Sequence, residues 1–255
     1  MVAPYERVHT PVAFWRPACE HRRGLAAIEL EIVRRIPLFS ELDAETLCIL
    51  AGLAQIRRCV AGDKIVQQDL PAHGVYVIVK GRASVSVAAR DGRVLILREI
   101  GEDEIIGEVS LLDGGLPSAT VTAVTNLELI VVDRQSFLNL LEERPKIAVA
   151  LLPVLASRLR RLTGWADDLA VLPLSARIAK CLLGLLAAHG QELGPSRSRI
   201  GRRFSQEDLA SMVGATRESM NKHLGRLERD RILSKESGYL VIVDLPRLQL
   251  EAQPG

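Results

Sequence analysis

The sequence predicts an α+β fold in which an N-terminal domain of short strands is joined by one long helix to a small C-terminal domain. Three observations predict it. Residues 58–133 form short apolar runs punctuated by glycines, residues 145–172 carry a helical apolar pattern, and residues 204–243 read as two short helices followed by two strands. The 255 residues, about a quarter of them charged, are enough for two globular domains.

Residues 1–27, rich in proline and arginine, are expected to form an irregular extension. They are either disordered or packed on the next domain through Phe14 and Trp15. This stretch lacks the apolar core of a signal peptide, and no apolar run in the chain approaches the ~20 residues of a membrane span. We therefore expect a cytoplasmic protein that does not bind membranes.

The four cysteines show no paired spacing. We expect free thiols, three of them largely buried, and neither disulfides nor a metal site. The residues are Cys19, Cys48, Cys59 and Cys181.

Residues 28–144 are predicted to form a jelly-roll-like domain. Helices at 28–35 and 43–53 precede the strands. The stretch VYVIVKGRASVSV alternates in polarity, and ARDGRVLILREI predicts a hairpin with Asp91 and Gly92 at its tip. Many short strands at this spacing indicate a sandwich or a barrel.

Residues 145–172 are predicted to form one long helix that begins at Pro145. Its apolar residues alternate at spacings of four and three, as in a heptad repeat. An ordinary buried helix face would also be apolar, but the alternating spacing favours a coiled coil and hence a homodimer. The seam comprises Ala148, Leu152, Leu155, Leu159, Leu162, Ala166 and Leu169.

Residues 173–255 are predicted to form the C-terminal domain, with a hinge at Pro173 and a first helix over 174–188. Ser205 and Asp208 have capping-box spacing before a second helix, which Gly214 ends. Thr216 would cap a third helix, and ILSKESGYLVIV would follow as two strands around a Ser-Gly turn. This order is typical of a winged helix-turn-helix.

The outward face of the third helix carries Arg217, Glu218, Asn221 and Lys222. A solvated surface helix would look alike, but the capped helix and glycine turn before it favour a recognition helix. In the major groove of DNA, Arg or Lys can bond a guanine edge and Glu can accept from a cytosine amine. Helix starts, with their hydroxyls and amides, suit phosphate contacts. The residues expected there are Ser205, Gln206, Thr216 and Ser219.

The charge is uneven along the chain. From Ser175 onward, thirteen Lys and Arg face nine carboxylates, whereas residues 60–145 carry eight against thirteen. The two halves therefore have different partners, double-stranded DNA for the basic one. We expect a cluster of four arginines between 197 and 203 to touch phosphates.

LASMVGATRESMNKHLGRLERDRIL closely resembles the DNA-reading helices of the CRP/FNR family of transcription regulators. The resemblance implies a homodimer that binds a palindrome of TGTGA-type half-sites and that works with RNA polymerase. Arg217, Glu218 and Lys222 match the family's R-E-x-x-x-R/K reading pattern. A dimer helix of ~39 Å would set two such helices about one DNA turn, ~34 Å, apart.

IIGEVSLLDGGLPSATVTAV resembles the phosphate-binding cassette of the same family, G-E-x-x-L-L-x-x-G-P-R-S-A-T. It implies a cyclic-nucleotide-binding β-roll, with Glu108 on the ribose hydroxyl and a nucleotide as a possible effector. Pro117 stands where the family has the arginine that pairs the cyclic phosphate. Losing that contact removes on the order of 1.5–3 kcal/mol. The expected effector residues are Gly107, Glu108, Val109, Ser110, Pro117, Ser118, Ala119 and Thr163.

A second departure lies on the long helix, where the family closes the pocket with a Thr and a Ser. Here those positions are Leu162 and Thr163. We expect weak or no cyclic AMP binding, with another effector or none. Arg82 or Arg98, on a neighbouring strand, is a candidate replacement for the missing arginine.

The sequence leaves a second function open for the sensor domain. The alternative is a regulator that depends on cyclic AMP, cyclic GMP or a cyclic dinucleotide, or a haem or redox sensor on the same fold. An iron–sulfur sensor needs clustered N-terminal cysteines, and the chain has no C-x-x-C. Haem ligation would fall to His21, Cys59 or His73. We expect no enzyme, since no Ser/His/Asp set or phosphate-transfer loop is present, and the intact DNA-reading pattern speaks against a module without DNA activity.

Overall fold

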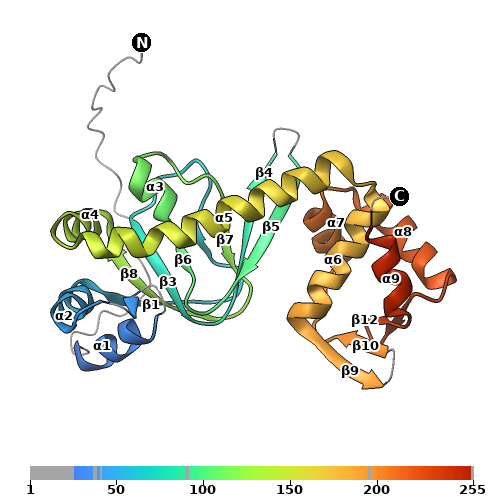
Figure 1. Cartoon of the computed structure of the whole chain (residues 1–255), viewed down its shortest axis with the longest axis horizontal. Helices are drawn as coiled ribbons and strands as arrows, with labels where there is room; N and C mark the ends of the chain where they lie inside the picture. Colours follow the sequence, from blue (N-terminus) through green and yellow to red (C-terminus); the bar gives the residue numbers. More distant parts are fainter. Residues whose placement is uncertain (1–25, 37–38, 41, 90–91, 195–196, 254–255) are drawn as a thin grey trace, which may run out of the picture.

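The computed structural model describes residues 26–253 except 37–38, 41, 90–91 and 195–196. A β-rich N-terminal domain and a C-terminal domain of helices and a small sheet lie at opposite ends of the molecule (Figure 1). Helix α5 (Pro145–Val171) joins them. This is the α+β architecture that the sequence predicts. The expected N-terminal extension lies outside the described residues except at its very end, where helix α1 (Ala26–Arg35) begins.

The N-terminal domain contains two four-stranded antiparallel sheets, with strand orders β1-β8-β3-β6 and β2-β7-β4-β5. Strands far apart in sequence are neighbours, because β1 pairs with β8 and β2 with β7, so the sheets form a roll. The predicted hairpin is present as β4 and β5, although residues 90–91 of its tip lie outside the described part. The strands are β1 (Gln55–Cys59), β2 (Lys64–Val66), β3 (Gly74–Lys80), β4 (Ala83–Ala88), β5 (Val94–Ile100), β6 (Ile105–Ile106), β7 (Thr120–Ala123) and β8 (Leu127–Asp133).

Strand β3 explains why this domain needs helices outside its sheets. Successive side chains of a strand point to opposite faces. Tyr76 and Ile78 therefore enter the core between the two sheets, whereas Val75 and Val77 face a second core. That second core is filled from α2 (Ala44–Leu53), α4 (Arg134–Glu143) and the first turns of α5.

One expectation about the cysteines is wrong. Cys48, on α2, is exposed, Cys59 is buried, Cys181 is half-buried, and Cys19 lies outside the described residues. The helix buries the face that contains Leu47, Leu50 and Ala51, and Cys48 falls on the opposite face.

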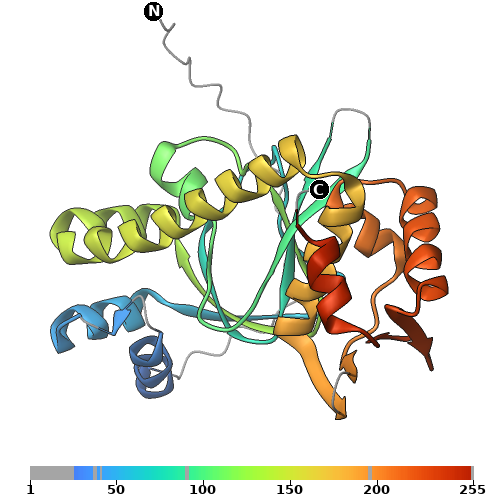
Figure 2. The same cartoon turned by 45° about the vertical axis from the view of Figure 1, so that its right-hand side comes forward.

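The predicted long helix is present, ending one residue before the predicted 172, and runs along one side of the roll from α4 to the C-terminal domain (Figures 1 and 2). It begins at Pro145, where the missing N–H is not needed, and ends at Val171 before Pro173. Pro153 lies inside it. The next helix, α6 (Leu174–His189), starts from Pro173 as its N-cap residue.

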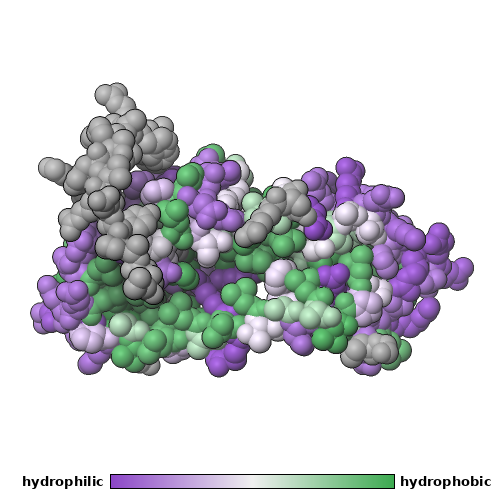
Figure 3. Space-filling model, turned by 90° about the horizontal axis from the view of Figure 1, so that it is seen from above, coloured by the Kyte–Doolittle hydropathy of each residue, from purple (hydrophilic) through white to green (hydrophobic). Residues whose placement is uncertain are grey.

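The C-terminal domain holds the predicted helix-turn-helix and the two wing strands, which turn at Ser237 and Gly238. Two further strands and a last helix were not predicted. Every residue of β9 is exposed and only Ile200 of β10 is buried, so neither strand shows apolar alternation. The elements are β9 (Gly190–Gly194), β10 (Arg197–Ile200), α7 (Gln206–Val213), α8 (Arg217–Arg229), β11 (Leu233–Glu236), β12 (Tyr239–Ile242) and α9 (Leu245–Glu251). Seen from above, hydrophilic residues dominate this end of the molecule (Figure 3).

Candidate DNA interface and effector site

Helices α7 and α8 are each capped at their start and are joined by a turn at a glycine. The hydroxyl of Ser205 accepts from the Asp208 N–H at 3.0 Å, and the Asp208 carboxylate accepts from the Ser205 N–H at 3.1 Å. Gly214 ends α7 at φ +66°, a left-handed conformation that favours glycine. The hydroxyl of Thr216 then caps α8 by accepting from the Ser219 N–H at 3.2 Å.

Helix α8 buries one face and leaves the other free. Met220, Leu224 and Leu227 are at most 2% exposed and anchor the helix in the domain core. Arg217, Glu218, Asn221 and Lys222 are all exposed. Helix α8 itself lies at the outer end of the C-terminal domain (Figure 1). Within the described residues, no hydrogen bond or ion pair engages the side chains of Arg217, Glu218 and Lys222. These three side chains are therefore available to an external partner.

The residues expected to touch phosphates are at the helix starts, as predicted. Ser205, Gln206 and Thr216 stand at the beginnings of α7 and α8, and the Thr216 hydroxyl also donates to the Ser219 hydroxyl at 3.0 Å. Ser219 is half-buried in the first turn of α8. The hydroxyls of Ser205 and Thr216 already serve as caps, so the backbone amides of these turns are the main donors left for a phosphate.

The arginines between 197 and 203 are engaged inside the chain instead of standing free. Arg197 pairs with Glu236 at 2.5 Å, Arg199 bonds the Gln191 side chain, and Arg203 donates to the Ser237 carbonyl at 3.0 Å. Arg199 and Arg203 also lie over the Tyr239 ring, at 4.8 and 4.9 Å from its centroid. From the sequence we expect these arginines to touch phosphates. In the structure they make internal contacts that hold the small sheet and its wing together.

The C-terminal domain is also fastened to the roll. Arg202 pairs with Glu99 of β5, and the His189 ring lies 3.9 Å from the same carboxylate. Arg82 approaches His189 at 3.4 Å, which places this candidate phosphate partner at the domain boundary instead of at the cassette. The turn at Gly214 lies against α5 and β5, because a Cβ there would be 3.5 Å from Leu169 and 3.7 Å from Leu95.

The cassette begins as a short helix, α3 (Glu108–Asp113), after a left-handed Gly107 at φ +87°. The Ser110 hydroxyl, nearly buried, donates to the Gly107 carbonyl at 3.2 Å, and Val109 points outward with 43% exposure. Pro117 is buried, and its carbonyl accepts from the Asp69 N–H at 3.0 Å. Ser118 is exposed and Ala119 half-buried just before β7.

The carboxylate of Glu108 is occupied by a residue that sequence reasoning missed. Arg158, on α5, donates to Glu108 and to the Ile105 carbonyl, and Glu108 is only 2% exposed. The one signal available was position: Arg158 stands beside the heptad seam residue Leu159, on the flank of α5 that faces the roll.

Arg98, the other candidate for the missing arginine, lies close enough to Arg158 and Arg161 for their charges to interact. It pairs with Glu104, and burial lowers the pKa of Arg98 despite that pairing. Arg158 and Arg161 are close enough to lower this pKa further. Thr163 is not part of this group: it is exposed and donates to the Leu159 carbonyl of its own helix at 3.0 Å.

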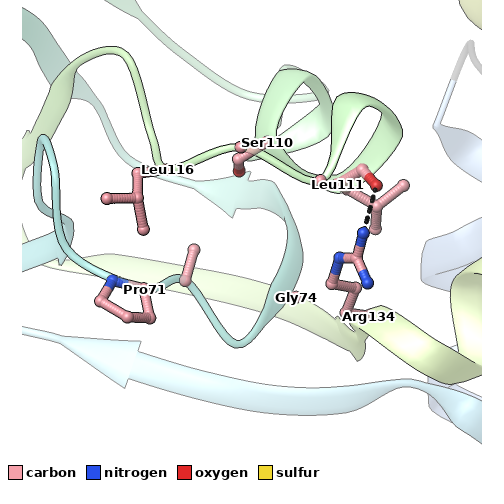
Figure 4. Close-up of a pocket in the computed structure, with 9 residues that line it drawn as sticks. Pro71, Gly74, Ser110, Leu111, Leu116 and Arg134 are labelled. Atoms are coloured by element: carbon pink, nitrogen blue, oxygen red, sulfur yellow. Dashed lines mark hydrogen bonds between the residues drawn. The ribbon is translucent and has the colours of Figure 1, made fainter. Parts of the chain in front are cut away.

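A cavity of about 230 Å³ lies beside the cassette, between the loop before β3 and the start of α4. In Figure 4, Pro71 and Leu116 line one side, and on the other the Arg134 guanidinium donates to the Leu111 carbonyl at 3.3 Å. Glu108 does not line this cavity. This cavity is therefore separate from the place where the Glu108 carboxylate would contact a ligand.

Comparison with known proteins matches both halves of the chain. The cyclic nucleotide-binding domain matches residues 56–144, and the Crp-like helix-turn-helix domain matches residues 176–251. A "CRP-like cAMP-activated global transcriptional regulator" of Mycobacterium tuberculosis is 30% identical over 223 residues, covering 88% of this chain and 99% of the relative. The chain belongs to the CRP/FNR family.

Other CRP/FNR proteins also resemble the chain in sequence or in fold. The "cAMP-activated global transcriptional regulator CRP" of Salmonella typhimurium is 28% identical over 179 residues, 70% of this chain and 84% of the relative. Two solved structures share the fold. One is a putative CRP/FNR regulator from Eubacterium rectale, with TM-score 0.72, 15% identity and coverage of 85% of this chain and 97% of that one. The other is the c-di-GMP responsive regulator CLP of Xanthomonas campestris, with TM-score 0.69, 25% identity and coverage of 78% and 99%.

Membership in the CRP/FNR family makes this a DNA-binding transcription regulator and not an enzyme. Within the described stretches, no helix is long and apolar enough to cross a membrane. In the same stretches, no three His, Cys, Asp or Glu side chains gather as a metal site would require.

Proposed function

We propose that the chain acts as a homodimer that reads a palindrome of TGTGA-like half-sites through α8. We propose further that its sensor domain does not take cyclic AMP in the way usual for the family. RNA polymerase is the partner that this role implies at a promoter.

The observation that carries the DNA half is the state of the three reading residues. Arg217 and Glu218 lie in the first turn of α8 and Lys222 follows just over one turn later, all exposed and without partners in the described chain. An arginine and a lysine with free donors can bond guanine edges, and a free glutamate can accept from a cytosine amine. A merely solvated helix of this charge pattern would gain from internal ion pairs, which these three residues do not make.

Dimerisation is supported by the exposed stripe on α5. Leu152, Leu159 and Leu162 of the heptad seam are 61%, 66% and 48% exposed in the single chain. Large apolar side chains repeated on one helix face favour a helix of a second copy as the occupant. At ~1.5 Å per residue, the 27 residues of α5 span ~40 Å, enough to support two C-terminal domains about one DNA turn apart.

The proposal for the sensor rests on Arg158 and Pro117. The Glu108 carboxylate, which a ribose hydroxyl would need, already accepts from Arg158, and buried Pro117 offers no charge to a phosphate. A cyclic nucleotide would have to break the buried ion pair and would lack its main phosphate partner. The alternative is a nucleotide-dependent regulator in which Arg98, Arg158 and Arg161 supply the positive charge. The cyclic nucleotide-binding domain match and the cyclic AMP-activated relatives favour that alternative.

Fluorescence anisotropy on a labelled TGTGA palindrome tests both halves. The protein is titrated with and without cyclic AMP, and a duplex of the same composition in scrambled order is the control. We expect affinity for the palindrome to exceed that for the scrambled duplex by about 10³-fold or more and to be unchanged by cyclic AMP. Equal affinity for both duplexes contradicts the reading role. Specific binding that requires cyclic AMP supports the reading role and contradicts the proposal for the sensor.

A further inference from the structure

A second cavity, of about 480 Å³, lies between the two domains, and no cassette residue from Gly107 to Ala119 lines it. Its walls come from β5 of the roll, the last turns of α5, and helices α6 and α7 of the C-terminal domain. Most of the surface is apolar, with Trp165 and Leu169 on α5 facing Leu185 and Met212. This volume and this lining fall in the range of small-molecule sites.

The charged groups around this interdomain cavity are nearly all neutralised by one another. Lys180 pairs with Asp168 at 2.6 Å, and Glu99 pairs with Arg202. Arg98 pairs with Glu104. Burial, with Arg82 and Arg202 nearby, lowers the pKa of His189 in spite of Glu99, which favours the neutral ring.

Arg177 is the exception among the described lining residues. It is half-buried on α6 and forms no ion pair; its Nη1 donates to the Val213 carbonyl at the end of α7, at 3.0 Å. Its Nε is buried and has no acceptor in the described chain. Arg177 thus brings a positive charge without an ion-pair partner in the described chain to the wall of an apolar cavity, where an anion would neutralise it.

We propose that the interdomain cavity binds a small amphipathic acid. The apolar body of the ligand lies against Trp165, Leu169 and Met212, and its single carboxylate or sulfonate accepts from Arg177. The ligand then touches the roll, α5 and the helix that precedes α8. It stabilises this arrangement of the two domains by its differential affinity for it, and so changes DNA affinity.

Gly184 shows how the cavity can be filled without disturbing the fold. It lies on α6 in the cavity wall, and a Cβ added there would meet nothing within 4 Å. A Gly184→Leu change therefore places a side chain in the cavity, and leucine also favours the helix more than glycine does. Gly52 is the matched control: it lies on α2, away from the cavity, and also has open space at its Cβ.

The test uses 1-anilinonaphthalene-8-sulfonate, an aromatic body with one sulfonate, as the probe. Energy transfer from tryptophan to the probe is measured in a Trp15→Phe background, which leaves Trp165 as the only tryptophan of the chain. We expect saturable transfer, reversed by an excess of octanoate. Gly184→Leu and Arg177→Met should each raise the dissociation constant by about tenfold or more, and Gly52→Leu should leave it unchanged.

Two results would overturn the proposal. One is probe binding with the same dissociation constant in Gly184→Leu and in the parent, because the probe then lies elsewhere. The other is an Arg177→Met variant that weakens the sulfonate no more than it weakens N-phenyl-1-naphthylamine, the uncharged analogue. If Arg177→Met does not fold, the Gly184→Leu result alone decides. None of these measurements involves DNA, so failure of the proposed DNA-reading role would not affect the outcome.

Discussion

The guanidinium of Arg158, on the helix that links the two domains, pairs with the buried carboxylate of Glu108 on the cassette. The same guanidinium donates to the Ile105 carbonyl, just before the cassette. A side chain of α5 thus satisfies the hydrogen-bond acceptors that a ligand in the cassette would otherwise contact. Any effector that reaches Glu108 must displace Arg158, and the position of α5 would respond.

Breaking this ion pair should destabilise the protein. In Arg158→Met the Glu108 carboxylate stays buried without its charge partner, and we expect the free energy of unfolding to fall by about 3 kcal/mol. Urea denaturation measures the change. Glu108→Gln added to Arg158→Met should recover much of the loss, because no buried charge then remains. A single variant as stable as the parent would contradict the pairing.

Reading by α8 predicts a loss specific to the cognate sequence. Arg217→Ala should weaken binding to the palindrome by about 1–3 kcal/mol and leave binding to scrambled DNA nearly unchanged. Arg229→Ala, an exposed arginine in the last turn of the same helix, is the control and should not alter discrimination. Anisotropy with both duplexes supplies the values. An equal loss on both duplexes would mean that Arg217 contacts only phosphates.

Pairing through α5 predicts that one charge on the seam separates the subunits. Leu159→Glu changes a side chain that is 66% exposed in the single chain, so the fold should survive while the dimer dissociates. Sedimentation should show a mass near 27.9 kDa for this variant and about twice that for the parent. Val171→Glu is the control, as it lies on α5 with 63% exposure but outside the seam. Parent protein that sediments as a monomer would contradict the proposal.

The entry to the cassette depends on a residue without a side chain. Gly107 has φ +87°, and a Cβ would approach the Gly74 carbonyl oxygen to 2.8 Å. Gly107→Ala should therefore lower the free energy of unfolding by about 1–2 kcal/mol from the backbone alone, and the clash adds to this. Gly52→Ala, in open space on a helix, should instead raise it by about 0.5–1 kcal/mol. Urea midpoints that move the same way in both variants would refute this reading.

Acid should loosen the contact between the domains through His189. Burial, with Arg82 and Arg202 nearby, lowers the pKa of His189 below its usual 6.5, and Glu99 only partly offsets this. An unfolded chain takes up the proton as pH falls through about 6.5, whereas the folded chain does so only at lower pH. The stability that the folded protein has with a neutral His189 is therefore fully present above pH 6.5. It is lost as the pH falls through the pKa of His189 in the folded state.

The comparison of His189→Gln with the parent isolates this contribution. Unfolding free energies at pH 7.5 and pH 5.5 should differ less in His189→Gln than in the parent. The pKa of His223 is also lowered by burial, but that residue is present in both proteins and its share cancels. Equal pH dependence in the two proteins would exclude His189 as a source.

The sequence predicted those parts of the fold that local patterns determine. Helix α5, the capped helices α7 and α8, and the wing turn at Gly238 follow from apolar spacing, caps and glycines over a few residues. Strand β9 could not be predicted, because its residues are all exposed and it exists only by pairing with β10.

The candidate sites divide in the same way. The exposed face of α8 was predictable, because the apolar residues Met220, Leu224 and Leu227 recur at helical spacing and so mark the buried face, which leaves the polar residues on the other. The partner of Glu108 was not, because Arg158 lies fifty residues away in the chain and only the packing of α5 on the roll brings them together. The internal contacts of the arginines between residues 197 and 203 could not be predicted for the same reason, because their partners come from β5, β9 and the wing.

Those internal contacts also set how the protein would respond to ionic strength. DNA binding releases counterions, and the logarithm of the binding constant falls with the logarithm of salt concentration by about 0.9 per phosphate neutralised. Arg197 and Arg202 are already neutralised by Glu236 and Glu99, so they would release few ions unless those pairs broke. The C-terminal domain should therefore hold DNA with a shallower salt dependence than its thirteen basic residues suggest.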